Sequence, residues 1–272
     1  MVELGQIRVN SPAGIHLAVI KSPLEILWNN DDFVAVNKPA GLSSIPGRGE
    51  RDSVLERLAA QLALPASGTT DPRLRVVHRL DKETSGVLLF AKNSTAQRHV
   101  SHQFQNNQVH KEYLALVVGR PATSEGEIDA PMAPHPNSPR RMTIVRHGGR
   151  PARTLWRVEE YFRGFSLLRV LPKTGKTHQI RLHLQSIGLP LAIDPLYHPT
   201  PPGAATGLYL SSFKRDYRPT AGEPERPLID RLTLHAEKLR FVLPDGNSRE
   251  LLAPLPKDFR AVLNQLRRHA KR

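Results

Sequence analysis

The length and order of the apolar segments constrain this chain most strongly. Leu24–Trp28 and Phe33–Val36 are apolar runs of strand length, joined by the turn-rich residues Asn29–Asp32. Farther along, Thr154–Phe162 and Phe165–Leu171 repeat this arrangement. Two such runs on either side of a short polar turn predict an antiparallel hairpin. Because the hairpins and helical segments do not alternate as regular strand–helix–strand units, we expect an α+β fold with a mixed, largely antiparallel sheet flanked by helices and loops.

Other segments fit strands or a long connection. Val87–Ala91 is a short apolar run, and Tyr113–Val118 is apolar on both faces, which predicts a central place in the sheet. Leu232–Leu243 is also rich in strand-forming residues. Residues 119–151 carry many Pro and Gly among polar groups. We expect them to form a long connection with little regular structure.

Helical periodicity marks the remaining regular segments. Ser53–Leu62 has Ser and Glu at the spacing of a capping box, followed by an apolar face. Asn93–Phe104 and Thr177–Gly188 each begin with a residue that can cap a helix. Residues 257–272 combine an apolar face with a basic end. We expect a helix in each segment.

The length of the chain fits a single large domain. The 272 residues are enough to bury a sizeable core, and no internal repeat stands out. We expect one domain over residues 24–272, preceded by an extended arm over 1–23. The proline-rich residues 199–227 predict a surface excursion, and 257–272 a basic C-terminal helix.

The charge balance indicates a polyanionic partner. Lys and Arg number 39 against 25 Asp and Glu, a formal net charge of +14. Because each neutralised phosphate releases condensed counterions, nucleic acid is the first candidate and an acidic membrane surface the second. A basic protein without any such partner is the remaining interpretation.

Cysteine usage and hydropathy limit the kinds of site the chain can hold and its location in the cell. The chain has no cysteine, which excludes disulfides, thiolate catalysis and Cys-based zinc sites. No apolar run approaches the ~18 residues that span a bilayer, and the N-terminus lacks the pattern of a secretory signal. We expect a soluble, cytoplasmic protein with no membrane contact.

The segment His78–Gly86 is the densest in chemically capable side chains. Asp81 lies between Arg79 and Lys82, just before an apolar strand, where such groups are held on a rigid scaffold. Neighbouring cations favour the ionised carboxylate, and an ionised carboxylate can act as a nucleophile. The competing interpretation is a surface turn with solvated charges.

Two further segments carry polar groups of interest. Gly175–His183 contains Gly-Lys-Thr, but a phosphate-binding loop would need glycine at position 170, which is Val170. Its two histidines lack the Glu of a zinc protease, which argues against a metal site. Arg181 is able to pair with a carboxylate, although a surface Arg is the default. Tyr113 is either a core phenol or a group that stacks on a base or moves a proton.

These segments together resemble a known family. His78–Gly86 is similar to the signature of RluA-type pseudouridine synthases, in the short members without an N-terminal S4-like domain. Asn37–Leu42, Lys111–Ala115, Gly175–His183 and Leu234–Ala236 resemble the other motifs of that family. Their order and spacing hold from about residue 24 to residue 260. The resemblance implies a pseudouridine synthase catalytic domain that acts on structured RNA (ribosomal RNA, transfer RNA or both). Separately from the resemblance, we expect a monomer.

The resemblance also implies residue roles. Asp81 would be the nucleophile, attacking either the ribose C1′ or the base. Tyr113 would stack on the target base and remove its C5 proton, and Arg181 would pair with Asp81. Arg79 would take the place of the flipped nucleotide. Further RNA contacts would come from His78, Thr84, Lys176 and Leu234. The reaction is an isomerisation, so neither a metal nor a cofactor is expected.

The chain departs from the family pattern at two places. Lys176 stands where Arg is usual, which keeps the charge but loses the planar fork. Ile193, just before Asp194, stands where Gly is usual.

Two other functions fit the residues. One is an RNA-binding protein or chaperone that keeps the fold without activity, and the other is a glycosidase that uses Asp81 to hydrolyse the nucleoside bond.

Overall fold

The computed structural model describes residues 22–47, 49–50, 52–65, 73–198, 206–214, 216–218 and 223–270. A ten-stranded sheet runs in the order β1-β2-β4-β11-β5-β10-β9-β6, with β3 paired to β4 and β12 to β11. Its strands are β1 (Glu25–Asn29), β2 (Phe33–Lys38), β3 (Arg75–Val76), β4 (Ser85–Ala91), β5 (His110–Val118), β6 (Glu125–Asp129), β9 (Arg153–Tyr161), β10 (Phe165–Pro172), β11 (Leu234–Val242) and β12 (Ser248–Leu252).

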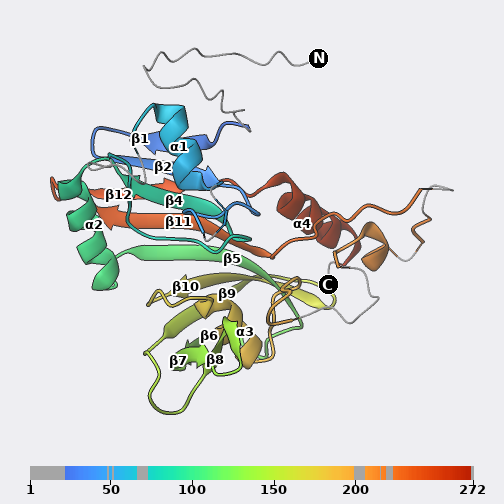
Figure 1. Cartoon of the computed structure of the whole chain (residues 1–272). Coiled ribbons are helices and arrows are strands. Elements are labelled where there is room, and N and C mark those ends of the chain that lie inside the picture. The colour runs from blue at the N-terminus through green and yellow to red at the C-terminus, as the bar shows by residue number, and fades with distance from the viewer. Residues whose placement is uncertain are drawn as a thin grey trace.

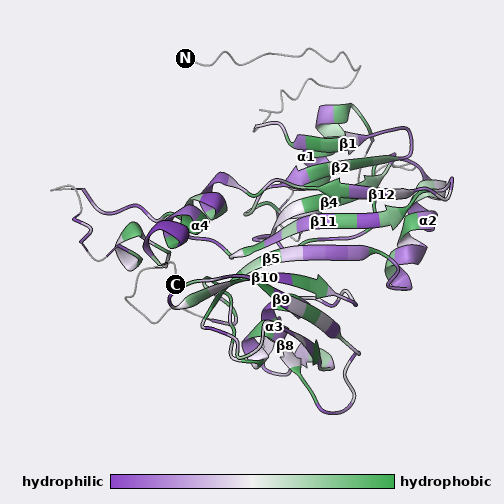
Figure 2. Cartoon of the chain, turned by 180° about the vertical axis from the view of Figure 1, so that it is seen from behind, coloured by the Kyte–Doolittle hydropathy of each residue, from purple (hydrophilic) through white to green (hydrophobic). Residues whose placement is uncertain are grey.

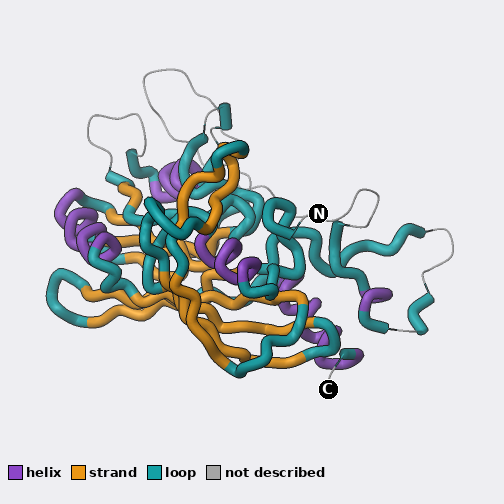
Figure 3. The backbone as a smooth tube through the Cα atoms, turned by 90° about the horizontal axis from the view of Figure 1, so that it is seen from below, coloured by secondary structure: helices purple, strands orange, loops and turns teal. Residues whose placement is uncertain are grey.

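The predicted fold class is confirmed. Every pairing in this sheet is antiparallel except that of β11 with β4, so the sheet is mixed and largely antiparallel. Figure 1 shows β5 between the strands β2, β4 and β11 on one side and β10 and β9 on the other. The predicted hairpins are β1–β2 and β9–β10, and the predicted central strand is β5. Helices lie around this sheet (Figure 3).

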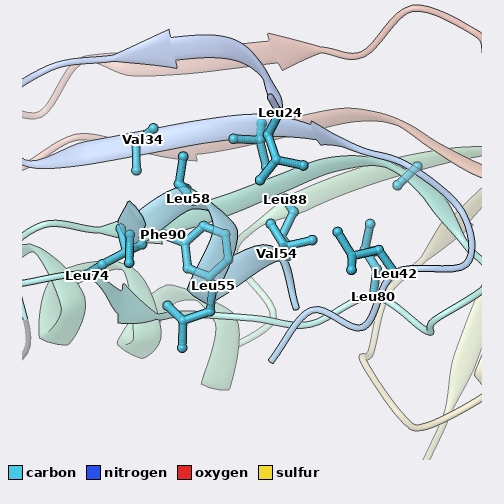
Figure 4. Close-up of a cluster of buried hydrophobic side chains, with 13 residues drawn as sticks. Leu24, Val34, Leu42, Val54, Leu55, Leu58, Leu74, Leu80, Leu88 and Phe90 are labelled. Carbon is cyan, nitrogen blue, oxygen red and sulfur yellow. The ribbon is translucent and has the colours of Figure 1, made fainter. Parts of the chain in front are cut away.

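The first two helices pack on opposite faces of the first half of the sheet. They are α1 (Val54–Leu62) and α2 (Ser94–Gln105). Alternate residues of β2 divide between them, because successive side chains of a strand point to opposite faces. Val34 and Val36 join the cluster of α1, shown in Figure 4, whereas Phe33 and Ala35 join the cluster of α2. Both faces of β2 and β4 are therefore hydrophobic, and Figure 2 shows the two strands in largely hydrophobic colours.

The other two helices cover the second half. They are α3 (Gln179–Ser186) and α4 (Lys257–His269). Leu114 and Leu116 of β5 pack with α4, and Ala115 and Val117 pack with α3. Tyr113 follows the same alternation and contacts the clusters of both α1 and α3. Helices α1 and α3 thus lie on one face of the sheet, and α2 and α4 lie on the other.

The helix caps follow the sequence in two cases. Ser53 accepts a hydrogen bond from the backbone N–H of Glu56 at 3.2 Å, and Asn93 accepts one from Ala96 at 2.8 Å. Each satisfies an amide that has no partner inside the helix. The predicted starts of α1 and α2 are confirmed.

The predicted start of α3 is wrong. The helix begins at Gln179, and its capping residue is His178, with φ 55° and no side-chain cap. Thr177 is exposed, and the backbone N–H of Lys176 is instead bound by the Gln179 side chain at 2.9 Å. The helix ends at Ser186, so that Ile187, inside the predicted helical segment, falls after the last turn and is 41% exposed.

Residues 119–151 are not the irregular connection that their composition predicts. They hold β6 at the edge of the large sheet and a separate hairpin, β7 (Met132–His135) with β8 (Ser138–Ile144). Only a few apolar side chains of this region are buried, Ile128 and Met132 among them. An edge strand and an isolated hairpin need little apolar surface, so hydropathy gave no strand pattern here.

One expectation lies largely, and another partly, outside the described residues. Of the arm over 1–23, the structure describes only residues 22 and 23, and much of 199–227 is not described. Within the latter, Leu210–Ser212 form the single 3-10 turn η1. Among the residues that the structure describes, no helix is long and apolar enough to cross a membrane.

Candidate active site

An open cavity of about 860 Å³ lies where the predicted site residues converge. Its walls come from the loops 43–47, 77–84 and 172–181, together with side chains of β5 and β11. The volume falls within the range of ~300–1,000 Å³ usual for small-molecule sites. Asp81, Tyr113 and Arg181, which lie far apart in the sequence, all line it.

Asp81 and Arg181 form an ion pair at the cavity wall. Arg181 Nη1 donates to Asp81 Oδ2 at 3.0 Å. The Arg181 side chain is 8% exposed and that of Asp81 27%, so the carboxylate remains open to the cavity. In the part of the chain that the structure describes, no hydrogen bond to Oδ1 of Asp81 is found. One oxygen is held and the other is free to react.

A second carboxylate, which sequence reasoning did not assign, holds Arg181 in place. Asp194 accepts hydrogen bonds from Arg181 Nε and Nη2, each at 2.8 Å, and is 1% exposed. Burial raises the pKa of Asp194, but the hydrogen bonds and charge of Arg181 outweigh it, so the net pKa lies below the usual value. The Asp194 carboxylate stays charged. The only sequence signal for it was a lone Asp after the apolar run Leu189–Ile193.

Lys38 anchors the loop that carries Asp81. It ends β2, is completely buried, and its Nζ donates to the carbonyls of Pro39, Lys82 and Thr84, each at 2.8 Å. Burial lowers the pKa of Lys38 to about 7, while the negative charges of Glu83 and Asp81 oppose the shift. With all three donors used on carbonyls, the Lys38 ammonium ties the backbone just after Asp81, at residues 82 and 84, to the end of β2.

The end of the signature segment is shaped by its contact with β11. Gly86 has φ +121°, and a Cβ there would lie 2.1 Å from the carbonyl oxygen of Ala236. Only glycine allows so close an approach. Beside it, the buried Ser85 hydroxyl lies 2.9 Å from Nδ1 of His235. Several residues that carry the family resemblance thus position the loop of Asp81 and do not face the cavity themselves.

Tyr113 opens on to the cavity beside Asp81. Burial, and secondarily the charge of Asp81, raise the pKa of Tyr113 well above its ordinary value. The phenol is therefore neutral before reaction, when it is suited to stacking or to donating a hydrogen bond. Removing a proton requires the phenolate, which this environment disfavours while Asp81 is charged.

The residues expected to contact RNA take different places. Arg79 is exposed at the cavity, Lys176 is half-buried, and Leu234 is a buried part of the wall. Thr84 also lines the cavity, but it is only 2% exposed. Their contacts with RNA stay predictions.

His78 interacts mainly with the protein. Its Nε2 accepts the backbone N–H of Leu89 at 3.0 Å, and its ring stacks on Phe104 with centroids 4.7 Å apart. Burial, with a smaller effect from Lys111, lowers the pKa of His78 to about 3. The ring is neutral and offers no charge to a phosphate at neutral pH. An RNA contact of His78 stays a prediction.

The sequence of this chain matches a known protein family. Residues 32–186 match the model of the RNA pseudouridylate synthase family. Ribosomal large subunit pseudouridine synthase D of Nitrosomonas europaea is 39% identical over 90% of this chain and 66% of the relative. The protein of the same name from Xanthomonas campestris is 37% identical over 99% of this chain and 77% of the relative.

Solved structures agree with these sequence relatives. Human RNA pseudouridylate synthase domain containing 4 superposes with a TM-score of 0.64 at 28% identity, covering 89% of this chain and 93% of that one. Human RNA pseudouridylate synthase domain containing 1 gives a TM-score of 0.64 at 25% identity, covering 89% and 87%. The chain therefore belongs to the RNA pseudouridylate synthase family and is an RNA pseudouridine synthase, as its motifs predict.

Proposed function

We propose that this enzyme isomerises uridine in ribosomal RNA of the large subunit, with Asp81 as its nucleophile. The names of the relatives from Nitrosomonas and Xanthomonas support this class of substrate. The observation that carries the chemistry is the ion pair in the cavity: Arg181 holds Oδ2 of Asp81 and leaves Oδ1 free.

The reaction exchanges one bond to the base for another. Asp81 Oδ1 bonds to the nucleotide, the bond between N1 and C1′ breaks, and the base turns within the cavity. A bond between C5 and C1′ then forms, C5 loses its proton, N1 gains one, and the carboxylate of Asp81 is released. No atom is gained or lost, so the RNA keeps its mass.

Tyr113 and Arg79 have complementary roles in this proposal. Tyr113 stacks on the flipped base, and base–aromatic stacking contributes ~1–3 kcal/mol. When Asp81 becomes covalently bound its charge disappears, which removes one of the two causes of the raised pKa of Tyr113. The phenolate of Tyr113, the form that can accept the C5 proton, is then less disfavoured. Arg79, exposed beside the nucleophile, fills the gap left in the RNA stack.

The net charge supports an RNA partner. Lys and Arg exceed Asp and Glu by 14, and Lys111 and Lys176 both line the cavity. Transfer RNA, which carries the same phosphate charge, is the other target that the sequence predicts. The monomeric state and cytoplasmic location also stay predictions.

Pseudouridine mapping tests the proposal. RNA from cells with and without the gene is compared, and the purified protein and its Asp81→Asn variant are then incubated with the unmodified RNA. We expect large-subunit ribosomal RNA to lose a pseudouridine in the deletion strain. The wild-type protein should restore it and Asp81→Asn should not. A modification missing only from transfer RNA would refute the substrate, and an active Asp81→Asn variant would refute the nucleophile.

Mass spectrometry separates the alternatives. Isomerisation leaves the mass of the target fragment unchanged, whereas a glycosidase would lower it by the mass of the base. A chaperone without activity would bind the RNA and leave every uridine unmodified.

A further inference from the structure

His178 has an unusual backbone conformation at the edge of the cavity. Its φ of 55° places it in the left-handed region, where residues other than glycine are uncommon and carry a conformational cost. It forms no side-chain cap for α3. Capping the helix therefore does not explain this conformation. The conformation does set the direction of the imidazole, which lines the cavity.

Tyr197 fixes one nitrogen of this imidazole. The hydroxyl of Tyr197 lies 3.0 Å from His178 Nδ1 and accepts the backbone N–H of Met142 at 2.8 Å. Among the described residues, Nδ1 is the acceptor within reach of the hydroxyl proton, so the hydroxyl donates to it. Burial lowers the pKa of His178, although the negative charge of Asp81 opposes the shift. The net shift is downward, so the ring is neutral at neutral pH. A neutral ring that accepts at Nδ1 carries its proton on Nε2.

The protonated nitrogen lies next to the nucleophile. His178 Nε2 is 3.8 Å from Asp81 Oδ2, too far for a hydrogen bond, and His178 lines the cavity. Oδ2 is already bound by Arg181. The Nε2–H group is thus a donor without a protein acceptor among the described residues, close to where the reacting atoms of a nucleotide must lie.

We propose that His178 is a positioning residue, whose Nε2–H donates a hydrogen bond to an oxygen of the target uridine next to the glycosidic bond. Two oxygens fit this description, the 2′-hydroxyl of the ribose and the 2-oxo group of uracil. The inference rests on the proposed reaction at Asp81 and adds a contact that orients the nucleotide toward Oδ1. Tyr197 supports it by holding the tautomer.

The test combines two variants with two modified targets. His178→Asn is chosen because Asn tolerates the left-handed conformation, and its shorter side chain withdraws the donor from the cavity. His178→Gly is a second variant that removes the backbone cost. Single-turnover rates are measured on unmodified RNA and on RNA with 2′-deoxyuridine or 2-thiouridine at the target. RNA affinity and thermal unfolding are measured in parallel.

We expect both variants to fold and to bind RNA like the wild type, and to react roughly 3- to 10-fold more slowly, the effect of one neutral hydrogen bond. One of the modified targets should slow the wild-type enzyme by a similar factor. On that target, His178→Asn should cause no further loss, because the hydrogen bond is already absent. The target that shows this behaviour identifies the oxygen.

Two results would overturn the inference. One is a wild-type rate for His178→Asn on unmodified RNA. The other is a loss of the same size on all three targets, which is what a merely structural role predicts. All of these rates are measured on an RNA that the wild-type enzyme converts and that the Asp81→Asn variant does not. A wrong assignment of the substrate or the nucleophile therefore appears in these controls and not in the rate ratios.

Discussion

Arg181 and Asp194 form a bidentate ion pair in which two guanidinium nitrogens each lie 2.8 Å from a carboxylate oxygen. The remaining terminal nitrogen reaches Asp81 at 3.0 Å. Two of the three guanidinium nitrogens are thus used to hold the group still, and one is presented to the nucleophile. The direction of the free oxygen of Asp81 depends on this buried pair.

Replacing Asp194 with Asn should impair both stability and activity. The change breaks the buried one of the two ion pairs of Arg181 and leaves Asp81 as its remaining counter-charge. Breaking a buried pair typically costs about 3–5 kcal/mol, and Asp81 should keep the loss toward the lower end. Arg181 would also be free to turn toward Asp81 and bind both its oxygens. Urea unfolding and single-turnover rates measure the two effects. Asp52→Asn is the matched control, since it weakens a bidentate pair with Arg57 whose side chains are 24% and 35% exposed. It should cost at most ~1 kcal/mol.

Lys38→Met should disorder the loop of Asp81 and lower the rate of the reaction. Methionine has a similar length, but it leaves three loop carbonyls without their donor. The Thr84 carbonyl is buried, and an unsatisfied buried acceptor costs about 1–3 kcal/mol, whereas the carbonyls of the exposed Pro39 and Lys82 can turn to water. Hydrogen exchange of residues 80–85 should increase relative to the rest of the sheet. Lys92→Met, which removes contacts to the exposed turn at Asn29 and Asn30, should leave that loop unchanged.

The sequence predicted the parts of the fold that have strong local signals. The capping side chains of Ser53 and Asn93 mark the starts of α1 and α2, and a run that is apolar on both faces locates β5. The signals were weak where few apolar residues are buried, so β6 and the hairpin β7–β8 appeared as loop. At α3 the local pattern misled, because His178 adopts a left-handed conformation that no helix-start rule predicts.

The site was predictable through its resemblance to a family more than through its physics. Local charge indicated Asp81, but nothing in the spacing placed Arg181, 100 residues away, beside it. Asp194 and Lys38 act through contacts between distant strands and loops, and such contacts leave no periodic trace in the sequence. Their roles required the three-dimensional arrangement.

Substitutions at Tyr113 should separate stacking from proton transfer. Tyr113→Phe keeps the aromatic face and loses the hydroxyl, so RNA binding should persist while pseudouridine formation falls at least 100-fold, the scale of one proton-transfer group. Tyr113→Leu loses both, and it should also weaken RNA binding by ~1–3 kcal/mol of stacking. Filter binding and single-turnover assays distinguish them. A Phe variant with wild-type rate would exclude the phenol from proton transfer.

Acid should destabilise the fold through His78. The pKa of this histidine is lowered to about 3 in the folded protein, by burial first and by Lys111 second, against the ordinary value of 6.5 in an unfolded chain. Between these two pH values the unfolded chain binds more protons than the folded protein. The stability that the neutral His78 contributes to the folded protein is therefore fully present above pH 6.5 and is lost as the pH falls toward 3. His78→Gln keeps an acceptor for the Leu89 amide but cannot be protonated in this range. The free energy of unfolding, measured with urea at pH 7.5 and pH 5, should fall less in His78→Gln than in the wild type. The exposed His147→Gln should behave as the wild type does, and an equal loss in all three proteins would show that the buried ring does not govern the acid response.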